Sequence, residues 1–214
     1  MVAEFFGIVA WVVLGLIPIV NPVTTAPIFG ALSESYLRAE RNQLARLACL
    51  YATGILLTFL VGGALIMTFF GITIEGIRIA GGLVIGAIGF RMLFPAPVNP
   101  DVSMESERTL PSLAMTPLAM PMLSGPGAIA VILSISSEIA EGESIYTQMI
   151  GYLGAVVGIL IVTITCWLVL RASTSVMKFL GTSGIDAITR ILGFLLIAMA
   201  VQFIHIGRSG FLAG

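Results

Sequence analysis

Long apolar segments are the feature that most constrains the fold of this chain. A straight helix needs about 20 residues to cross the hydrocarbon core of a bilayer. Segments of about that length or longer lie at 5–32, 46–71, 76–94, 113–137, 147–170 and 187–207. Because their apolar residues do not alternate with polar ones, they indicate helices rather than barrel strands. The sequence therefore predicts an all-α integral membrane protein with six transmembrane helices.

Composition supports this prediction and excludes several classes of function. The chain is 58% hydrophobic and 10% charged, whereas a soluble domain is typically about 25% charged. Its net charge is -1 and no basic cluster is present, so we expect no nucleic-acid partner. Cys49 and Cys166 both lie in apolar segments, and we expect neither a structural disulfide nor a metal site or other cofactor. Because Glu4 stands where a signal peptide would be basic, we expect the first segment to be a span.

A polar, proline-rich and acidic stretch at 95–112 predicts an exposed linker between two halves, 1–94 and 113–214. If the N-terminus is outside, eight basic residues face the cytoplasm and two, Arg78 and Arg208, face outward. The eight are Arg38, Arg41, Arg46, Arg91, Arg108, Arg171, Lys178 and Arg190. Since cytoplasmic loops carry an excess of Lys and Arg, we expect a multi-pass protein with both termini outside.

Each half holds three spans, so the two halves would be inserted in opposite orientations. Matching segments occur in the same order in both halves. They are PIVNP (18–22) with PMLSGP (121–126), and RIAGGLVIGAIGF (78–90) with RILGFLLIAMAVQ (190–202). Such internal similarity is typical of transporters built from inverted repeats. We therefore predict two inverted three-helix repeats.

The first pair of matching segments interrupts the first and fourth spans. Asparagine is a favoured N-cap and proline is favoured at the first helical position. Asn21-Pro22 therefore predicts a new helix that begins near the middle of the bilayer. In the second half, Ser124 or Gly125 would be the cap and Pro126 the first helical residue. We predict that the first and fourth helices are both broken.

A helix that begins inside the membrane leaves unpaired N–H groups and the positive end of its dipole there. Two such ends could converge on a carboxylate, and the free carbonyl groups of the preceding half-helices could bind an ammonium group. Together they would bind an amino acid without a charged side chain. The alternative is a pair of kinked helices whose Thr hydroxyls bond the freed carbonyl groups. The candidate substrate-binding residues are Asn21, Pro22, Thr24, Thr25, Ser124, Gly125, Pro126 and Gly127.

Other residues favour structural roles. Small residues let helices pack closely, and this is the interpretation we favour for Gly81, Gly82, Gly86 and Gly89. Arg78 and Arg190 begin the third and sixth spans, where we expect them at the membrane interface. An ion pair with Glu75 or Asp186 is the alternative. His205 is the sole histidine and we expect it to be exposed.

The quoted motifs resemble those of a known family. IPIVNPVTTAPIF (17–29), PLAMPMLSGPGAIAVI (117–132) and ITRILGFLLIAMAVQFI (188–204) are similar to the MarC family of six-span membrane proteins, which includes the SnatA small neutral amino acid transporters. The resemblance covers nearly the whole chain. It implies transport of glycine or alanine across the cytoplasmic (inner) membrane. If the family's site residues are carried over to the matching motifs of this sequence, the resemblance implies a central site lined by Asn21, Pro22, Ser124, Gly125, Pro126 and Gly127.

The expected function is thus a secondary transporter that alternates access around two broken helices. The alternative is a passive channel or an exporter of another small solute. An intramembrane enzyme would need a nucleophile with a base or a metal cluster, and the spans hold no Lys or carboxylate near their centres, so we expect no enzymatic activity. A membrane scaffold without cargo is a fourth reading. Coupling to protons, the direction of transport and the oligomeric state stay open.

Overall fold

A computed structural model of the chain describes residues 2–94, 109–140, 142 and 144–213. All secondary structure in these residues is helical, which confirms the predicted all-α class. The helices are α1 (Val2–Val20), α2 (Pro22–Leu32), α3 (Arg38–Phe70), α4 (Ile74–Leu93), α5 (Leu110–Leu113), the π-helical η1 (Ala114–Leu123), α6 (Pro126–Ala140), α7 (Ile145–Arg171) and α8 (Ser173–Ala213).

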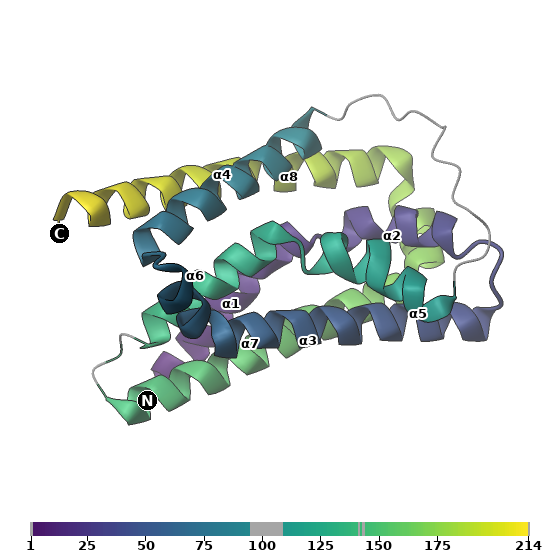
Figure 1. Ribbon diagram of the computed structural model, residues 1–214. Coiled ribbons are helices and arrows are strands. Elements are labelled where there is room, and N and C mark those ends of the chain that lie inside the picture. Colours follow the sequence, from purple (N-terminus) through teal and green to yellow (C-terminus); the bar gives the residue numbers. More distant parts are fainter. Residues whose placement is uncertain (1, 95–108, 141, 143, 214) are drawn as a thin grey trace.

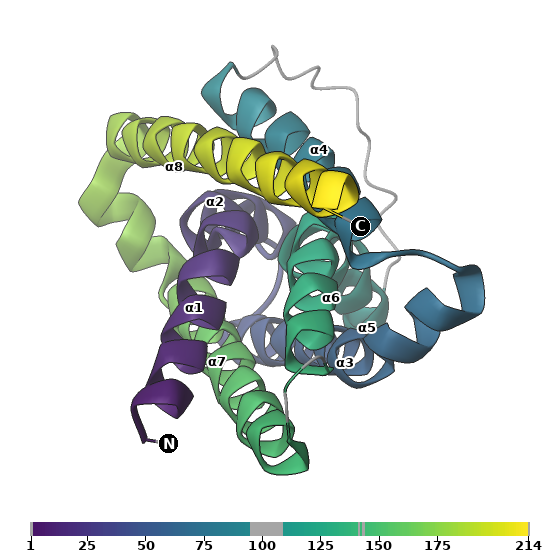
Figure 2. The ribbon, with the colours of Figure 1, turned by 90° about the vertical axis from the view of Figure 1, so that its left-hand side faces the viewer.

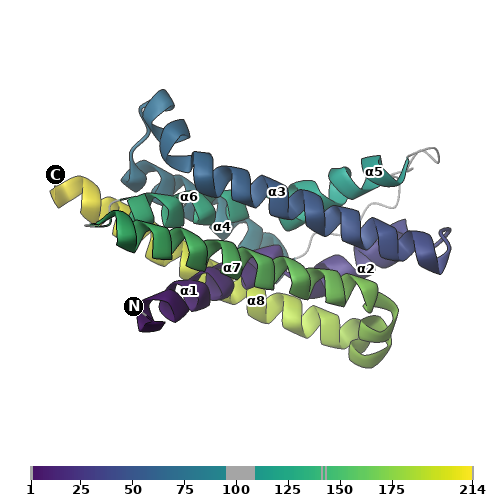
Figure 3. The ribbon, with the colours of Figure 1, turned by 90° about the horizontal axis from the view of Figure 1, so that it is seen from below.

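The helices form an elongated bundle (Figures 1 and 3). Both chain ends lie at the same end of it, which we name the terminal end. At the opposite, distal end α2 leads into α3 and α7 leads into α8. The pair α1 and α2, the series α5, η1 and α6, and the long helices α3, α7 and α8 run between these two ends. α4 begins at the terminal end and stops short of the distal end.

Four helices (α3, α4, α7 and α8) are long and apolar enough to cross a membrane. The pair α1 and α2 passes the same test jointly and is bent by 44° at its break. The fourth predicted span is divided into two shorter apolar helices, Leu110–Met120 and Pro126–Ala140. The described residues therefore hold four or five candidate spans, and the sixth stays a prediction.

Helix boundaries extend beyond several predicted spans. α3 begins at Arg38 and α8 begins at Ser173, because hydropathy marks only the apolar part of a helix and not its polar ends. Gly181 interrupts α8 with a positive φ of 61°, a conformation that glycine adopts without steric cost. Of the predicted linker, 95–108 lies outside the described residues, and α5 occupies 110–112.

Small residues join α4 and α8, which lie side by side (Figures 1 and 2). A Cβ atom on Gly89 would lie 2.7 Å from the carbonyl oxygen of Gly193, and one on Gly82 would lie 2.8 Å from that of Ala200. Real Cβ atoms essentially never come so close to another heavy atom. The glycines of α4 therefore serve close packing, as the sequence predicts.

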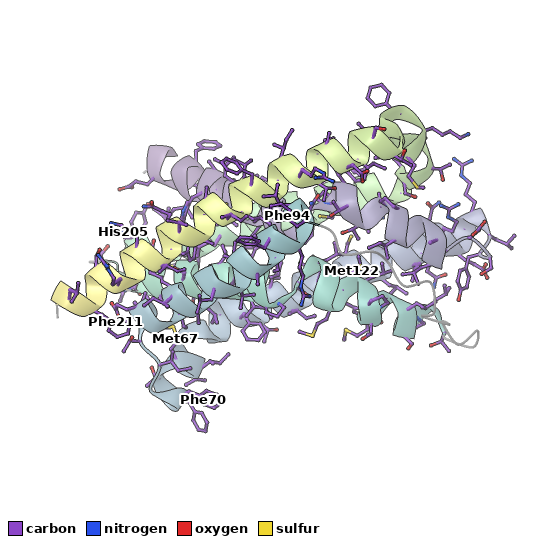
Figure 4. All side chains as sticks on the ribbon, turned by 90° about the horizontal axis from the view of Figure 1, so that it is seen from above. Met67, Phe70, Phe94, Met122, His205 and Phe211 are labelled. Carbon is purple, nitrogen blue, oxygen red and sulfur yellow. The ribbon has the colours of Figure 1, made fainter. Side chains whose placement is uncertain are left out.

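Most of the other extensive contacts join an element of one half to an element of the other. α1 packs on α7 and η1 on α3, while α2 packs on α8 and α6 on α4. The buried core includes Leu16, Leu56, Ile132 and Ile159. Large apolar side chains also cover the outside, and Phe70 and Phe211 project away from the bundle in Figure 4. This outer surface suits hydrocarbon rather than water.

Candidate functional site

The first break lies at Asn21, between α1 and α2. Asn21 adopts the left-handed conformation (φ 39°, ψ 72°), and its Oδ1 accepts a hydrogen bond of 3.3 Å from the N–H of Thr24. Pro22 is buried in the first turn of α2. Asn21 therefore caps a new helix that Pro22 begins, as predicted.

The two threonines of this break bond the backbone. The hydroxyls of Thr24 and Thr25 each donate to the carbonyl oxygen of Asn21 at 3.1 Å. This arrangement is the one expected for a kinked helix. The side-chain amide of Asn21, in contrast, has no hydrogen-bond partner for its Nδ2 although the residue is only 3% exposed. A buried amide donor without a partner is costly, at about 1–3 kcal/mol, and such a donor is suited to a bound acceptor.

The break also frees carbonyl groups at the end of α1. In a continuous helix each carbonyl accepts from the N–H four residues later. Pro22 has no N–H to offer Pro18, and the N–H of Thr24 is used by the Asn21 side chain. In the part of the chain that the structure describes, no hydrogen bond crosses the break to the carbonyls of Pro18, Ile19 or Val20. These oxygens are available to a cation.

The second break, between η1 and α6, has a different geometry. Ser124 donates from both its N–H (2.8 Å) and its hydroxyl (2.9 Å) to the carbonyl of Ala119. The first bond of α6 runs from the N–H of Ile129 to the carbonyl of Gly125 (3.0 Å). Gly125 is therefore the cap, whereas Ser124 closes the preceding helix, so of the two predicted caps Gly125 is the correct one.

Because the cap residue Gly125 has no side chain, it offers no hydrogen bond to the first turn of α6. Pro126 has no N–H, and among the described residues no side chain bonds the N–H groups of Gly127 or Ala128. The positive end of the α6 dipole is thus left for another partner.

A cavity of about 460 Å³ adjoins the start of α6. Its walls come from the end of α1, from α4 and from the second break. The lining residues are Ile19, Val84, Ala87, Ile88, Arg91, Met122, Gly125, Pro126 and Gly127. A Cβ atom on Gly127 would lie 3.2 Å from Cγ2 of Ile19, so the end of α1 touches the start of α6. Figure 4 shows Met122 toward the middle of the bundle, far from His205 and Phe211 at the terminal end.

The structure brings only part of the predicted site to this cavity. Gly125, Pro126 and Gly127 line it. The others do not line it; they are Asn21, Pro22, Thr24, Thr25 and Ser124. Sequence reasoning missed Arg91 and Met122, and it expected a site without a charged side chain. Arg91 lies at the end of an apolar span, and the sequence indicates only that it is one of the basic residues expected on the cytoplasmic side. Nothing in the sequence shows that α4 packs on the second break.

A polar cluster of Arg78, Ser134 and Glu138 lies at the terminal end. Arg78 on α4 forms an ion pair with Glu138 on α6, and its Nε donates to Ser134 Oγ at 3.4 Å. The partner of Arg78 is thus Glu138 rather than Glu75. Arg190 makes no ion pair among the described residues, and His205 is exposed as predicted.

Comparisons with known proteins agree with the motifs. The family described as "MarC family integral membrane protein" matches residues 6–212. The proteins named "UPF0056 inner membrane protein MarC" from Salmonella typhimurium and Citrobacter koseri are each 40% identical over 196 residues. The protein of that name from Escherichia coli O1:K1 is 39% identical. In all three cases the alignment covers 88% of this chain and 88% of the relative. No solved structure matches the chain.

Proposed function

Because the chain belongs to the MarC family of integral membrane proteins, we propose that it is a secondary transporter of small neutral amino acids in the inner membrane. Glycine and alanine are the proposed substrates. The transporter would work by alternating access around the two breaks. This proposal joins the resemblance to SnatA transporters with the chemistry of the described site.

The cavity at the start of α6 is the observation that carries the proposal. Its volume of about 460 Å³ corresponds to about 15 waters at about 30 Å³ each, enough for a small amino acid with part of its hydration shell. Helix N-termini bind anions through bare N–H groups, and Gly127 and Ala128 supply such groups. The nearby free carbonyls of Ile19 and Val20 suit an ammonium group. An amino acid is a zwitterion, so it needs N–H groups for its carboxylate and carbonyl groups for its ammonium group.

The contacts between helices support the proposed inverted repeat. If α1 corresponds to η1, α2 to α6, α3 to α7 and α4 to α8, the observed packing is symmetric. Contact of α1 with α7 then corresponds to that of η1 with α3, and contact of α2 with α8 to that of α6 with α4. Secondary transporters commonly place the substrate between such repeats.

The proposed membrane orientation has both termini outside and six spans. The common location of both termini at one end of the bundle is consistent with an even number of crossings. Arg38, Arg171 and Lys178 belong to helix ends at the distal end, which would then face the cytoplasm. A reporter fused after Gly214 should be active only outside the cytoplasm. Cytoplasmic activity would refute the orientation.

Labelled glycine and alanine in proteoliposomes test the function. We expect saturable uptake and counterflow, in which unlabelled substrate inside accelerates entry of label. A passive channel would give flux without counterflow. Imposing a proton gradient in the same vesicles tests coupling. If neither amino acid enters proteoliposomes faster than it enters liposomes without protein, the proposal is refuted.

Asn21→Ala is the matched site variant, with Asn42→Ala on α3 as the control. Asn21 holds the first break, so its loss should lower glycine transport strongly while expression is kept. Asn42 is half-buried on α3 and belongs to neither break, so its variant should transport normally. If both variants transport glycine equally well, Asn21 is not part of the substrate site.

A further inference from the structure

We propose that Arg91 is the residue that binds the substrate carboxylate. This inference rests on the proposed function and adds a charged side chain to a site that the motifs describe without one. Among the described residues, Arg91 is the one charged residue that lines the cavity at the start of α6. Its neighbours there are apolar side chains and the backbone of Gly125 and Gly127.

The exposed side chain of Arg91 has no polar partner in the part of the chain that the structure describes. Arg78 forms an ion pair and Arg41 donates to Ser173 and Thr174. The side chain of Arg91, by contrast, makes no hydrogen bond or ion pair with any described residue. An arginine that lines a cavity with all five donors unused is available to an external anion.

The chemistry of the cavity selects a carboxylate. A guanidinium binds a carboxylate through two parallel hydrogen bonds. Gly125, Pro126 and Gly127 at the start of α6 line the same cavity, where the positive end of the α6 dipole also favours negative charge. None of the described residues that line the cavity is acidic, so none competes with a bound carboxylate. The remaining walls are aliphatic (Ile19, Val84, Ile88), which favours a substrate with a small, uncharged side chain.

The test compares Arg91→Gln and Arg91→Lys with the control Arg46→Gln. Arg46 is also an exposed arginine but it lines a separate cavity between α3 and α7. In glycine counterflow, Arg91→Gln should raise KM at least tenfold and Arg91→Lys by less, because lysine keeps the charge but loses the two-pronged geometry. Arg46→Gln should keep the wild-type KM. A KM of Arg91→Gln within twofold of wild type would overturn the inference.

A selectivity measurement shows whether Arg91 binds the substrate carboxylate or only supports the structure. Glycinamide lacks the carboxylate, so it should compete poorly with glycine for the wild type. In Arg91→Gln the preference for glycine over glycinamide should collapse, and an unchanged preference would overturn the inference. Glycine binding measured calorimetrically in detergent separates this inference from the proposed function. If glycine binds in a way that depends on Arg91 but is not transported, the transport function is refuted and the binding role of Arg91 is supported. If glycine does not bind to the wild type, the binding role of Arg91 is refuted.

A second, independent observation concerns the ion pair at the terminal end. Glu34 lies 12 residues after Pro22, and Glu138 lies 12 residues after Pro126, so the two glutamates occupy equivalent positions in the two halves. The arginines Arg78 and Arg190 are likewise equivalent. The repeat therefore contains two equivalent acid–base pairs. In this structure Arg78 and Glu138 are joined. Glu34 and Arg190 are exposed and form no ion pair with each other.

We infer that these two pairs close opposite ends of the pathway in turn. In an inverted-repeat transporter the two halves exchange conformations between inward-open and outward-open states. The pair Arg78–Glu138 links α4 to α6 at the terminal end. In the opposite state it would separate, while Glu34 and Arg190 would join the end of α2 to α8 at the distal end.

Cross-linking tests this exchange. The two native cysteines are replaced by alanine, and cysteines are introduced at positions 78 and 138 or at 34 and 190. A reducible bis-methanethiosulfonate reagent should join either pair and stop glycine counterflow, which reductant should restore. Glycine should decrease linking of one pair and increase linking of the other. If the 34–190 pair never links, or if linking leaves counterflow intact, the inference is wrong.

Discussion

Replacing Gly89 with alanine tests whether the α4–α8 contact holds the bundle together. The new Cβ would lie 2.7 Å from the carbonyl oxygen of Gly193, 2.9 Å from Cγ1 of Ile197 and 3.1 Å from its backbone nitrogen. Two of these three atoms belong to the backbone and cannot rotate away. The helices must therefore separate or lose their contact.

The expected size follows from two opposing effects. Overpacking a close contact costs about 1–3 kcal/mol, and a backbone clash belongs at about the upper end of that range. Alanine stabilises a helix by about 1 kcal/mol relative to glycine. The net loss for Gly89→Ala is thus about 2 kcal/mol. At about 2–4 °C per kcal/mol for a chain of this size, the melting temperature should fall by about 4–8 °C.

The assay is thermal unfolding in detergent, followed by intrinsic fluorescence. Gly54→Ala on α3 is the matched control, because nothing lies within 4 Å of a Cβ at Gly54. It should gain the helix propensity alone and melt about 2–4 °C higher than wild type. If Gly89→Ala melts as high as Gly54→Ala, the close approach of α4 and α8 is wrong.

Three further changes have defined outcomes. Gly127→Ala should keep the fold, because its Cβ meets side-chain atoms alone among the three nearest, those of Ile88, Ile19 and Ile85 at 3.1, 3.2 and 3.6 Å. It should nevertheless raise the KM for alanine more than the KM for glycine in counterflow, and equal KM values for both would contradict this. Thr25→Val removes the buried bond to the Asn21 carbonyl and should lower stability by about 0.5–1.5 kcal/mol in detergent melts; an unchanged melt would mean that the bond contributes nothing. Cys166 is 1% exposed and should stay unlabelled by a membrane-impermeant maleimide until detergent denaturation, as read by intact mass; rapid labelling of native protein would refute its burial.

Several features of the fold follow from the sequence for clear physical reasons. Asn21-Pro22 combines the preferred N-cap with the preferred first residue, so the start of α2 was predictable. Likewise, the small residues of the third span predict a close helix contact. Such local rules depend on nearest neighbours along the chain and need no knowledge of the tertiary structure.

Other features depend on contacts between distant segments. Ser124 has the residue type of a cap, yet its hydroxyl bonds Ala119 because η1 winds more widely than an α-helix before it ends. Arg78 could have paired with Glu75 on its own helix, but the packing of α4 on α6 brings it to Glu138. Arg91 becomes part of the cavity through the same packing, which no local pattern in the sequence encodes.

The central claim is that a small amino acid binds where α6 begins. The most direct measurement is a structure of the protein determined with glycine at saturating concentration. Our account predicts glycine in the cavity, with its carboxylate between Arg91 and the N–H groups of Gly127 and Ala128. Glycine bound elsewhere, or an empty cavity in a preparation that shows glycine counterflow, would contradict it.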